Sequence, residues 1–210
     1  LLRSKAAARL SKAITEAMQD LGMAGGRFVA TVAPAKEPRS DGIDDVELLV
    51  AGHPGADPKP IAKVASGGEL SRISLAIEVA ALGSDAVPTM VFDEVDSGIG
   101  GAVAEIVGRK LRQLGRARQV LCVTHLPQVS AQGHAHYRVS KAPVEGITRS
   151  AVELLDDAGR ERELARMLGG VEVGSEAHAA ARRLLEQAVA ADAGVQAPAA
   201  ARRARRSGTG

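Results

Sequence analysis

A short stretch of the sequence combines residue types that are suited to binding phosphate. It runs from Ser66 to Arg72 and reads Ser-Gly-Gly-Glu-Leu-Ser-Arg. Ser66 and Glu69 form a capping-box pattern, so the simplest interpretation is a well-started helix. Gly67 and Gly68 each cost a helix about 1 kcal/mol relative to alanine, which indicates a role beyond capping. Bare backbone amides, a hydroxyl and the positive end of a helix dipole can together bind phosphate oxygens.

Two acidic residues are suited to holding a metal ion and to activating water. Asp93 and Glu94 directly follow the apolar run 90–92, which predicts a strand. Ligands of open parallel sheets gather at the carboxyl ends of the strands, where Asp93 can reach a phosphate-bound Mg²⁺. Glu94 can then orient and deprotonate an attacking water as a general base. For the Asp93-Glu94 dipeptide alone, a solvated strand end is the plainer interpretation. The spacing between this dipeptide and the glycine pair favours the role in metal binding and water activation.

Two further polar groups are predicted at the same edge of the sheet. His125 comes just after the apolar run 120–123, and its imidazole could hydrogen-bond a terminal phosphate and report its presence. Asp96 follows the two acidic residues and would lie beside the same phosphate. The structural alternatives are a histidine with an internal partner and a turn built by Asp96, Ser97 and Gly98.

The spacing of apolar residues predicts the elements that position these groups. The unbroken run 120–123 is typical of a strand buried on both faces, as in a parallel sheet between helix layers. The first helix suits a surface helix or the end of a coiled coil equally well. The first part of the chain is expected to form a helix that stops at Gly22, and then antiparallel strands over 27–32 and 45–50 around a turn-prone stretch. The middle part is expected to form a helix from Ser66 to about Gly83, a strand from Pro88, a helix over 103–114 and a strand over 120–123. The last part is expected to form strands over 137–140 and 150–155, followed by helices over 160–168 and 175–190.

Composition limits the class of protein. With 210 residues and 45% apolar content the chain can form one sizeable core, and a net charge of +2 does not announce a nucleic-acid partner. The chain has three aromatic residues, so any contact with DNA would be mainly electrostatic. Cys122, inside an apolar run, is expected to be a small buried hydrophobe. Neither a signal-peptide pattern nor an apolar run of about eighteen residues occurs, so we expect a cytoplasmic location without a membrane segment.

A loop that usually accompanies such phosphate motifs is absent. None of the seven lysines follows a glycine, so the phosphate-cradling pattern G-x-x-x-x-G-K-[ST] does not occur, and we expect a piece of a larger protein. The run from Gly98 to Gly101 resembles a dinucleotide loop, but the last glycine of that pattern would fall at Val103. His134 and His136 match no zinc-ligand spacing.

Three runs of sequence together carry a family resemblance. They are Val64 to Arg72, Val91 to Ile99 and Val120 to Val129. In combination they resemble the C-terminal ATPase segment of the RecN family of bacterial DNA repair proteins, which are relatives of the SMC proteins within the ABC ATPase superfamily. The resemblance extends from about Gly26 to Leu185 and includes the Ala-Arg-Met-Leu-Gly-Gly run at 165–170.

The resemblance implies an α/β fold and a division of the chain. The fold would be the C-terminal lobe of an ATPase head that is formed from N- and C-terminal segments of one chain and joined by an antiparallel coiled coil. We therefore expect the end of a coiled-coil helix over 1–22 and a mainly parallel sheet flanked by helices over 23–190. Residues 191–210, with arginines at 202, 203, 205 and 206, are expected to form a disordered basic tail.

The resemblance also assigns roles to the residues described above. In such heads the signature segment contacts the γ-phosphate of ATP that is held by the other head. Carried over position by position, the roles are nucleotide contact for Ser66, Gly67, Gly68 and Glu69, Mg²⁺ binding in Walker B for Asp93, catalytic base for Glu94, a D-loop position beside the nucleotide for Asp96, and switch histidine for His125.

The implied cofactors are ATP and Mg²⁺. The implied partners are the N-terminal Walker A segment of the same protein, a second head in a homodimer, and DNA, with a role in recombinational repair of double-strand breaks at the nucleoid. The alternatives are another SMC-like or transporter-type ABC ATPase and a non-catalytic interaction module. Because the Walker A loop is absent, we expect no ATP hydrolysis from this chain alone.

Overall fold

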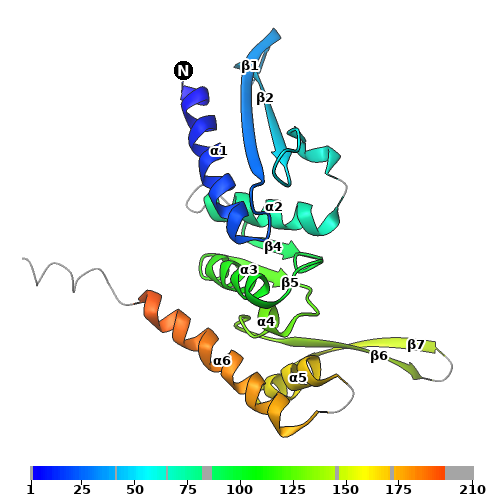
Figure 1. The fold of residues 1–210 in the computed structure, drawn as a ribbon. Helices are drawn as coiled ribbons and strands as arrows, with labels where there is room; N and C mark the ends of the chain where they lie inside the picture. The colour runs from blue at the N-terminus through cyan, green and yellow to red at the C-terminus, as the bar shows by residue number, and fades with distance from the viewer. Residues whose placement is uncertain are drawn as a thin grey trace, which may run out of the picture. The chain divides into compact units, whose positions relative to one another are not determined.

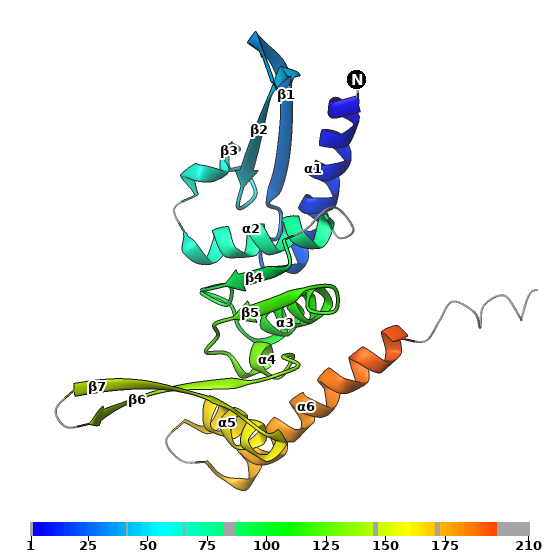
Figure 2. The same ribbon diagram turned by 180° about the vertical axis from the view of Figure 1, so that it is seen from behind.

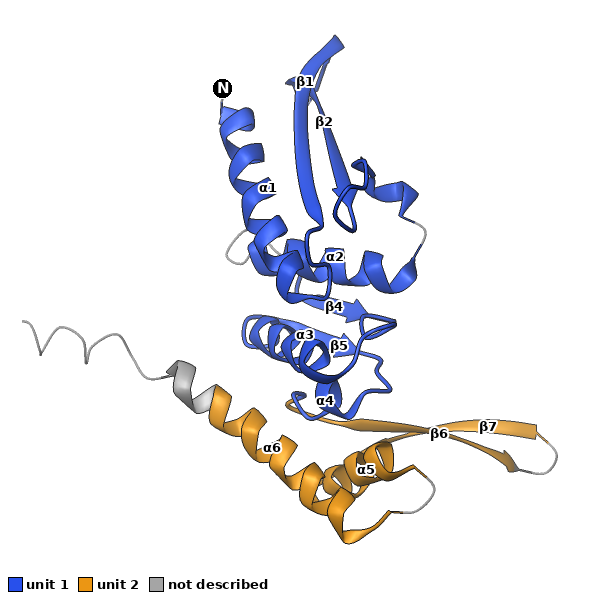
Figure 3. Cartoon of the chain, in the orientation of Figure 1, with its two compact units in different colours: residues 1–133 blue, residues 134–210 orange. Residues whose placement is uncertain are grey.

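The computed structural model describes residues 2–40, 42–64, 66–81, 87–144, 147–170 and 173–196. The chain divides into two compact units, residues 1–133 and 134–210, which Figure 3 shows in blue and orange. The predicted end of a helix at Gly83 and the arginine cluster of the tail lie outside the described residues.

The first unit contains most of the predicted elements (Figures 1 and 2). Helix α1 runs alongside the hairpin of β1 and β2, and α2 crosses beneath α1 in both views. The bounds are α1 Leu2–Asp20, β1 Arg27–Arg39, β2 Gly42–Ala51, β3 Lys59–Pro60, the 3₁₀ turn η1 Ile61–Lys63, α2 Gly67–Ala80, β4 Thr89–Phe92, α3 Gly101–Leu114, β5 Gln119–Cys122 and α4 Pro127–Ser130.

The core of the first unit lies where α1, β1, α2 and α3 meet. Ile14 and Met18, on the last turns of α1, are fully buried, as are Leu75 on α2 and Leu114 on α3. The chain leaves α1 at Gly22, whose φ of 78° is a left-handed value that favours glycine. This confirms the predicted stop, and α1 is thus anchored in the core by its C-terminal half.

Strand pairing differs from the expectation of a mainly parallel sheet. Among the described residues, β1, β2 and β3 pair antiparallel, β6 and β7 pair antiparallel, and only β4 and β5 pair in parallel. Apolar spacing identifies strands but does not say which strands pair, and short connections favour hairpins. Strand β1 also continues through Pro34 to Arg39, with an irregular register between those residues, where a turn-prone stretch was expected.

The parallel pair is open on one face. Phe92 on β4 is buried, whereas Val91 is 66% exposed and Leu121 on β5 is 46% exposed. Val123, just after β5, is 63% exposed. The prediction that the run 120–123, which contains most of β5, is buried on both faces was therefore wrong for the described residues. Helices of the first unit cover only one side of the β4–β5 pair.

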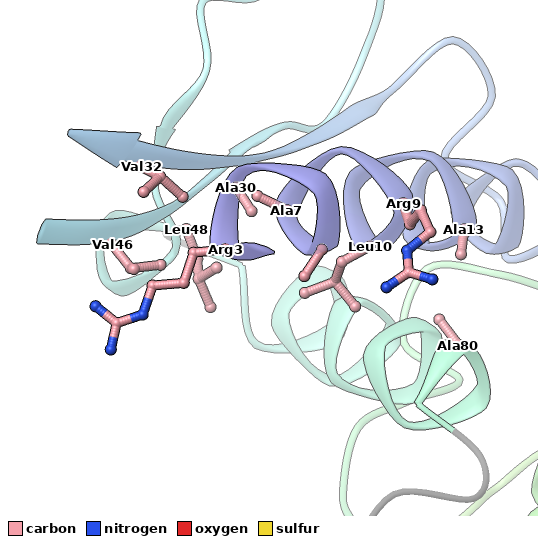
Figure 4. A pocket seen from close by; sticks show the side chains of 11 residues that line it. Arg3, Ala7, Arg9, Leu10, Ala13, Ala30, Val32, Val46, Leu48 and Ala80 are labelled. Carbon is pink, nitrogen blue, oxygen red and sulfur yellow. The ribbon is translucent and has the colours of Figure 1, made fainter. Parts of the chain in front are cut away.

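An apolar groove of about 580 Å³ lies on the first unit between α1, the β1–β2 hairpin and the end of α2 (Figure 4). Leu10 and Leu48 face it from helix and strand, and Arg3 and Arg9 project from the α1 side. The remaining lining residues are mostly small: Ala6, Ala7, Ala13, Ala30, Val32, Val46 and Ala80. In the part of the chain that the structure describes, no helix combines the length and apolarity needed to cross a membrane.

The second unit consists of a hairpin and two helices. They are β6 Tyr137–Val144, β7 Ile147–Leu154, α5 Asp157–Gly169 and α6 Ser175–Gln196. Leu164 and Ala165 on α5 and Ala181 on α6 are fully buried. Glu161 on α5 accepts a hydrogen bond from Arg182 on α6, at 3.1 Å.

Two carboxylates of α5 have lowered pKa values, which predicts that this unit loses stability in acid. Hydrogen bonds from His178 and Arg182 lower the pKa of Glu161, and paired hydrogen bonds from Arg166 lower the pKa of Glu163. A carboxylate with a lowered folded-state pKa contributes stability that is fully present above its ordinary value of 4.5 and is lost as the pH falls through the folded value.

We expect the melting temperature of the chain to fall as the pH drops below about 4.5, and to fall less in Glu163→Gln than in the wild type. Thermal unfolding followed by circular dichroism at pH 7, 4.5 and 3 measures both effects. Glu105→Gln, which alters an exposed i,i+4 pair with Arg109, is the matched control. Equal acid sensitivity of Glu163→Gln and wild type would contradict the assignment.

Candidate functional site

The start of α2 is built as the sequence predicts. Ser66 has extended backbone angles, and its Oγ accepts a hydrogen bond from the backbone N–H of Glu69, at 3.3 Å. Helix α2 begins at the next residue, Gly67. The capping function of Ser66 is therefore confirmed, and the two glycines occupy the first turn, where backbone N–H groups have no partner within the helix.

Gly67 lies against the second acidic residue of the sequence motif. A Cβ atom added at Gly67 would overlap Oε2 of Glu94. The carboxylate of Glu94 thus covers the first turn of α2, and a side chain at Gly67 would displace it. Glu94 has a φ of 56°, a left-handed conformation that is uncommon for residues other than glycine.

Gly68 allows the loop after β4 to touch α2. A Cβ atom at Gly68 would come within 2.8 Å of the Cβ of Ser97 and 3.1 Å of its carbonyl oxygen. One turn further along α2, the buried Arg72 donates a hydrogen bond from Nη1 to the same carbonyl, at 2.7 Å. The glycine and the arginine therefore hold this loop against the helix.

Asp93 is exposed at the carboxyl end of β4. Its carbonyl oxygen accepts a hydrogen bond from the hydroxyl of Ser71, at 2.6 Å, and its Oδ1 accepts one from the backbone N–H of Glu94, at 2.9 Å. The described residues contain no cluster of three or more metal-ligating side chains. Mg²⁺ is commonly held by one or two carboxylates together with phosphate oxygens and water, so Asp93 suits that ion when a phosphate supplies the other ligands.

Asp96 is turned into the protein. Its side chain is buried, and its Oδ2 accepts hydrogen bonds from the hydroxyl of Thr124 and from the backbone N–H of His125, the latter at 3.0 Å. Nδ1 of His125 lies 3.2 Å from the same oxygen, while the rest of that ring is largely exposed. The place predicted for Asp96 beside a nucleotide stays a prediction.

Cys122 is half-buried beneath the site and packs against the core, close to the expectation of a small buried hydrophobe. Burial, together with the nearby carboxylates of Asp96 and Asp93, raises the pKa of this thiol to about 12. Since the thiolate is the reactive form, Cys122 should be inert near neutral pH.

We expect the thiolate fraction of Cys122 at pH 8 to be roughly a thousandfold lower in the folded chain than for a thiol of ordinary pKa. Iodoacetamide should accordingly label the folded chain far more slowly than the chain unfolded in urea, as mass spectrometry can measure. Labelling at similar rates in both states would contradict this expectation.

The structure brings several of the predicted residues together and adds others. Gly67 lies against Glu94, and Gly68 lies against the loop that carries Asp96. His125 joins this loop through Asp96. Sequence reasoning gave no role to the side chains of Ser71, Arg72 and Thr124. Arg72 had a detectable signal, because a residue four positions after Gly68 lies on the same helical face.

Comparisons with known proteins show which sequences this chain is similar to. The chain is 59% identical over 187 residues to the DNA repair protein RecN of Xylella fastidiosa, a match covering 88% of this chain and 34% of that protein. It is 45% identical over 198 residues to the RecN of Streptomyces coelicolor, covering 89% of this chain and 35% of the relative. The chain thus spans about a third of the length of these relatives. No protein-family model matches it.

Solved structures with a similar fold have lower sequence identity to this chain than the relatives above. A crystallised Smc head domain with a coiled coil and joint, from Pyrococcus yayanosii, superposes with a TM-score of 0.53 at 24% identity. The match covers 75% of this chain and 28% of the Smc chain. Such a likeness concerns the fold alone, which is similar to part of the Smc head domain.

Proposed function

Because the chain is a RecN-type sequence over 88% of its length, we propose that it forms the C-terminal lobe of a RecN-like ATPase head that acts in DNA repair. The observation that carries the proposal is the contact between the first turn of α2 and the loop after β4. There Gly67 meets Glu94, and Gly68 and Arg72 hold Ser97. One small region thus presents free helix amides, a candidate base and a candidate metal ligand.

Each side chain has a role in this proposal. The amides of Gly67 and Gly68 contact the γ-phosphate of ATP bound by a second head, with Ser66 and Glu69 shaping that turn. Asp93 holds Mg²⁺, whose charge stabilises the phosphate oxygens. Glu94 takes the proton of the attacking water.

A complementary lobe of the head is proposed to pack on the first unit. The open face of the parallel pair, with Val91 and Leu121, supports this part of the proposal, because exposed apolar patches commonly mark interaction surfaces. The apolar groove beside α1 supports it in the same way. The proposed occupant is the N-terminal Walker A segment of the same protein, and the exposed start of α1, where Leu2 is 84% exposed, would continue into a coiled coil.

We expect the purified 210-residue chain to show no ATP turnover, because it contains no phosphate-cradling loop with a Gly-Lys step. Phosphate release should appear when the chain is mixed with the N-terminal segment of a RecN protein. A coupled phosphate-release assay, with Glu94→Gln as the control, measures both. Turnover by the chain alone that disappears in Glu94→Gln would overturn this expectation. Binding of the N-terminal segment without hydrolysis would favour a non-catalytic interaction module.

The wider proposal rests on the family resemblance of the sequence. Two complete heads would form a homodimer around ATP, and their engagement would be coupled to holding DNA at double-strand breaks during recombinational repair. The proposed location is the cytoplasm, at the nucleoid. The sequence contains only three aromatic residues, so DNA contacts are expected to be mainly electrostatic.

A further inference from the structure

The carboxylate of Asp96 is a junction between the two loops of the site. Asp96 is 2% exposed, and one of its oxygens, Oδ2, faces the hydroxyl of Thr124, the backbone N–H of His125 and Nδ1 of the same histidine. A buried carboxylate needs such partners, because an unpaired one is costly. The group therefore has a binding role within the protein.

The hydroxyl of Thr124 fixes this junction in place. It donates to Asp96 and accepts a hydrogen bond from the backbone N–H of Leu126, at 3.0 Å. A hydroxyl can do both at once, since it has one proton and two lone pairs. Thr124 thus ties the backbone on either side of His125 to Asp96.

This arrangement determines which nitrogen of the imidazole carries a proton. Nδ1 of His125 lies 3.2 Å from Oδ2 of Asp96, and a carboxylate oxygen presents only lone pairs, so the proton of a neutral ring is favoured on Nδ1, where it faces the carboxylate. In a neutral ring the second nitrogen, Nε2, then has no proton and is an acceptor. With most of the side chain exposed, Nε2 is the nitrogen left available to a ligand.

We propose that Asp96 and Thr124 are positioning residues that fix the tautomer and the direction of the His125 ring. Asp96 would thereby act on a bound nucleotide through His125, without contacting the nucleotide itself. The part of this inference that concerns nucleotide rests on the proposed function, whereas the ring geometry does not.

The loop that carries Asp96 is itself held in place. The backbone N–H of Ser97 donates to the carbonyl of Glu94 at 3.0 Å, and Arg72 donates to the carbonyl of Ser97. A turn that is fixed at Glu94 and on α2 gives the junction a rigid support. The orientation of the His125 ring is thus joined to the start of α2 through one short loop.

The ring geometry can be tested on the 210-residue chain without nucleotide. Two-dimensional ¹⁵N NMR of the histidine rings, recorded well above neutral pH, reports which nitrogen is protonated, and His125→Gln assigns the signal. We expect Nδ1 to be protonated in wild type. A proton on Nε2 of wild-type His125 would overturn the proposal.

Three variants separate the two positioning residues. In Asp96→Ala no acceptor faces Nδ1, so we expect the preference for a proton on Nδ1 to be lost. Thr124→Val should lose the Nδ1 tautomer preference, and Thr124→Ser, which keeps the hydroxyl, should restore it. An unchanged tautomer in Asp96→Ala overturns the role of Asp96, and an unchanged tautomer in Thr124→Val overturns that of Thr124. Amide spectra verify that each variant folds.

A second measurement concerns the complete RecN-like ATPase. Thr124→Val is expected to lower kcat with little change in KM, and Thr124→Ser to restore kcat. A fall in kcat with no change of tautomer would overturn the positioning proposal. If the wild-type protein has no ATPase activity, the proposed function fails, while the tautomer result still decides the ring geometry.

Discussion

In the complete protein that we propose to be an ATPase, Glu94→Gln is expected to lower kcat by about 10²- to 10⁴-fold while ATP binding persists. The glutamine keeps the size of the side chain and can hold water, but it cannot take a proton from the attacking water. The carboxylate that it replaces lies over the first turn of α2, where the proposed γ-phosphate would sit. Steady-state phosphate release and ATP binding by equilibrium titration measure the two quantities separately.

The backbone at Glu94 makes this substitution a clean test. Glutamine can adopt the left-handed φ of 56° at a cost similar to that of glutamate, so the turn after β4 should be retained. Glu47→Gln, on the exposed part of β2, is the matched control and should leave kcat unchanged. A kcat within threefold of wild type in Glu94→Gln would remove Glu94 from the role of base.

Gly68→Ala is expected to lower the free energy of unfolding of the chain by about 1–3 kcal/mol, although alanine is the better helix former. The added methyl group meets Cβ and the carbonyl oxygen of Ser97, at 2.8 and 3.1 Å. Backbone cannot move aside as easily as the end of a side chain, so the loop must shift and the hydrogen bond from Arg72 must lengthen. Urea denaturation of the 210-residue chain measures the loss.

Gly67→Ala is the matched control for this effect. The methyl group there meets only the end of the Glu94 side chain, which can rotate away. We therefore expect Gly67→Ala to be neutral or to stabilise the chain by up to about 1 kcal/mol through helix propensity. Equal losses in the two variants would show that the contact between Gly68 and Ser97 does not hold the loop.

The sequence was sufficient to predict the local parts of the site. The capping role of Ser66 depends on residues three positions apart, so it is readable directly. The positions of Asp93 and His125 after their strands follow from the apolar runs before them, and parallel pairing of β4 with β5 brings those strand ends to one edge. These features depend on short-range pattern and on a general rule of sheet topology.

The contacts between distant segments could not be predicted. The buried Asp96 bonds to Thr124, and the pattern of acidic residues gives no sign of which carboxylate turns inward. The contact of Arg72 with Ser97 likewise depends on how closely a loop approaches a helix. The exposed face at Leu121 was missed for a related reason: an apolar run shows that a strand needs cover on both sides, but not that the cover belongs to the described chain.

The parallel pair of β4 and β5 has a consequence for assembly. In a two-stranded sheet each strand has one outer edge whose backbone donors and acceptors do not pair with another strand. Among the residues that the structure describes, this holds for both β4 and β5. Such an edge accepts an added strand from any source, including another copy of the same chain. In the proposed head, the N-terminal segment and a second copy of this chain would therefore compete for the same backbone atoms. The order in which the segments are synthesised and meet would decide which of the two binds.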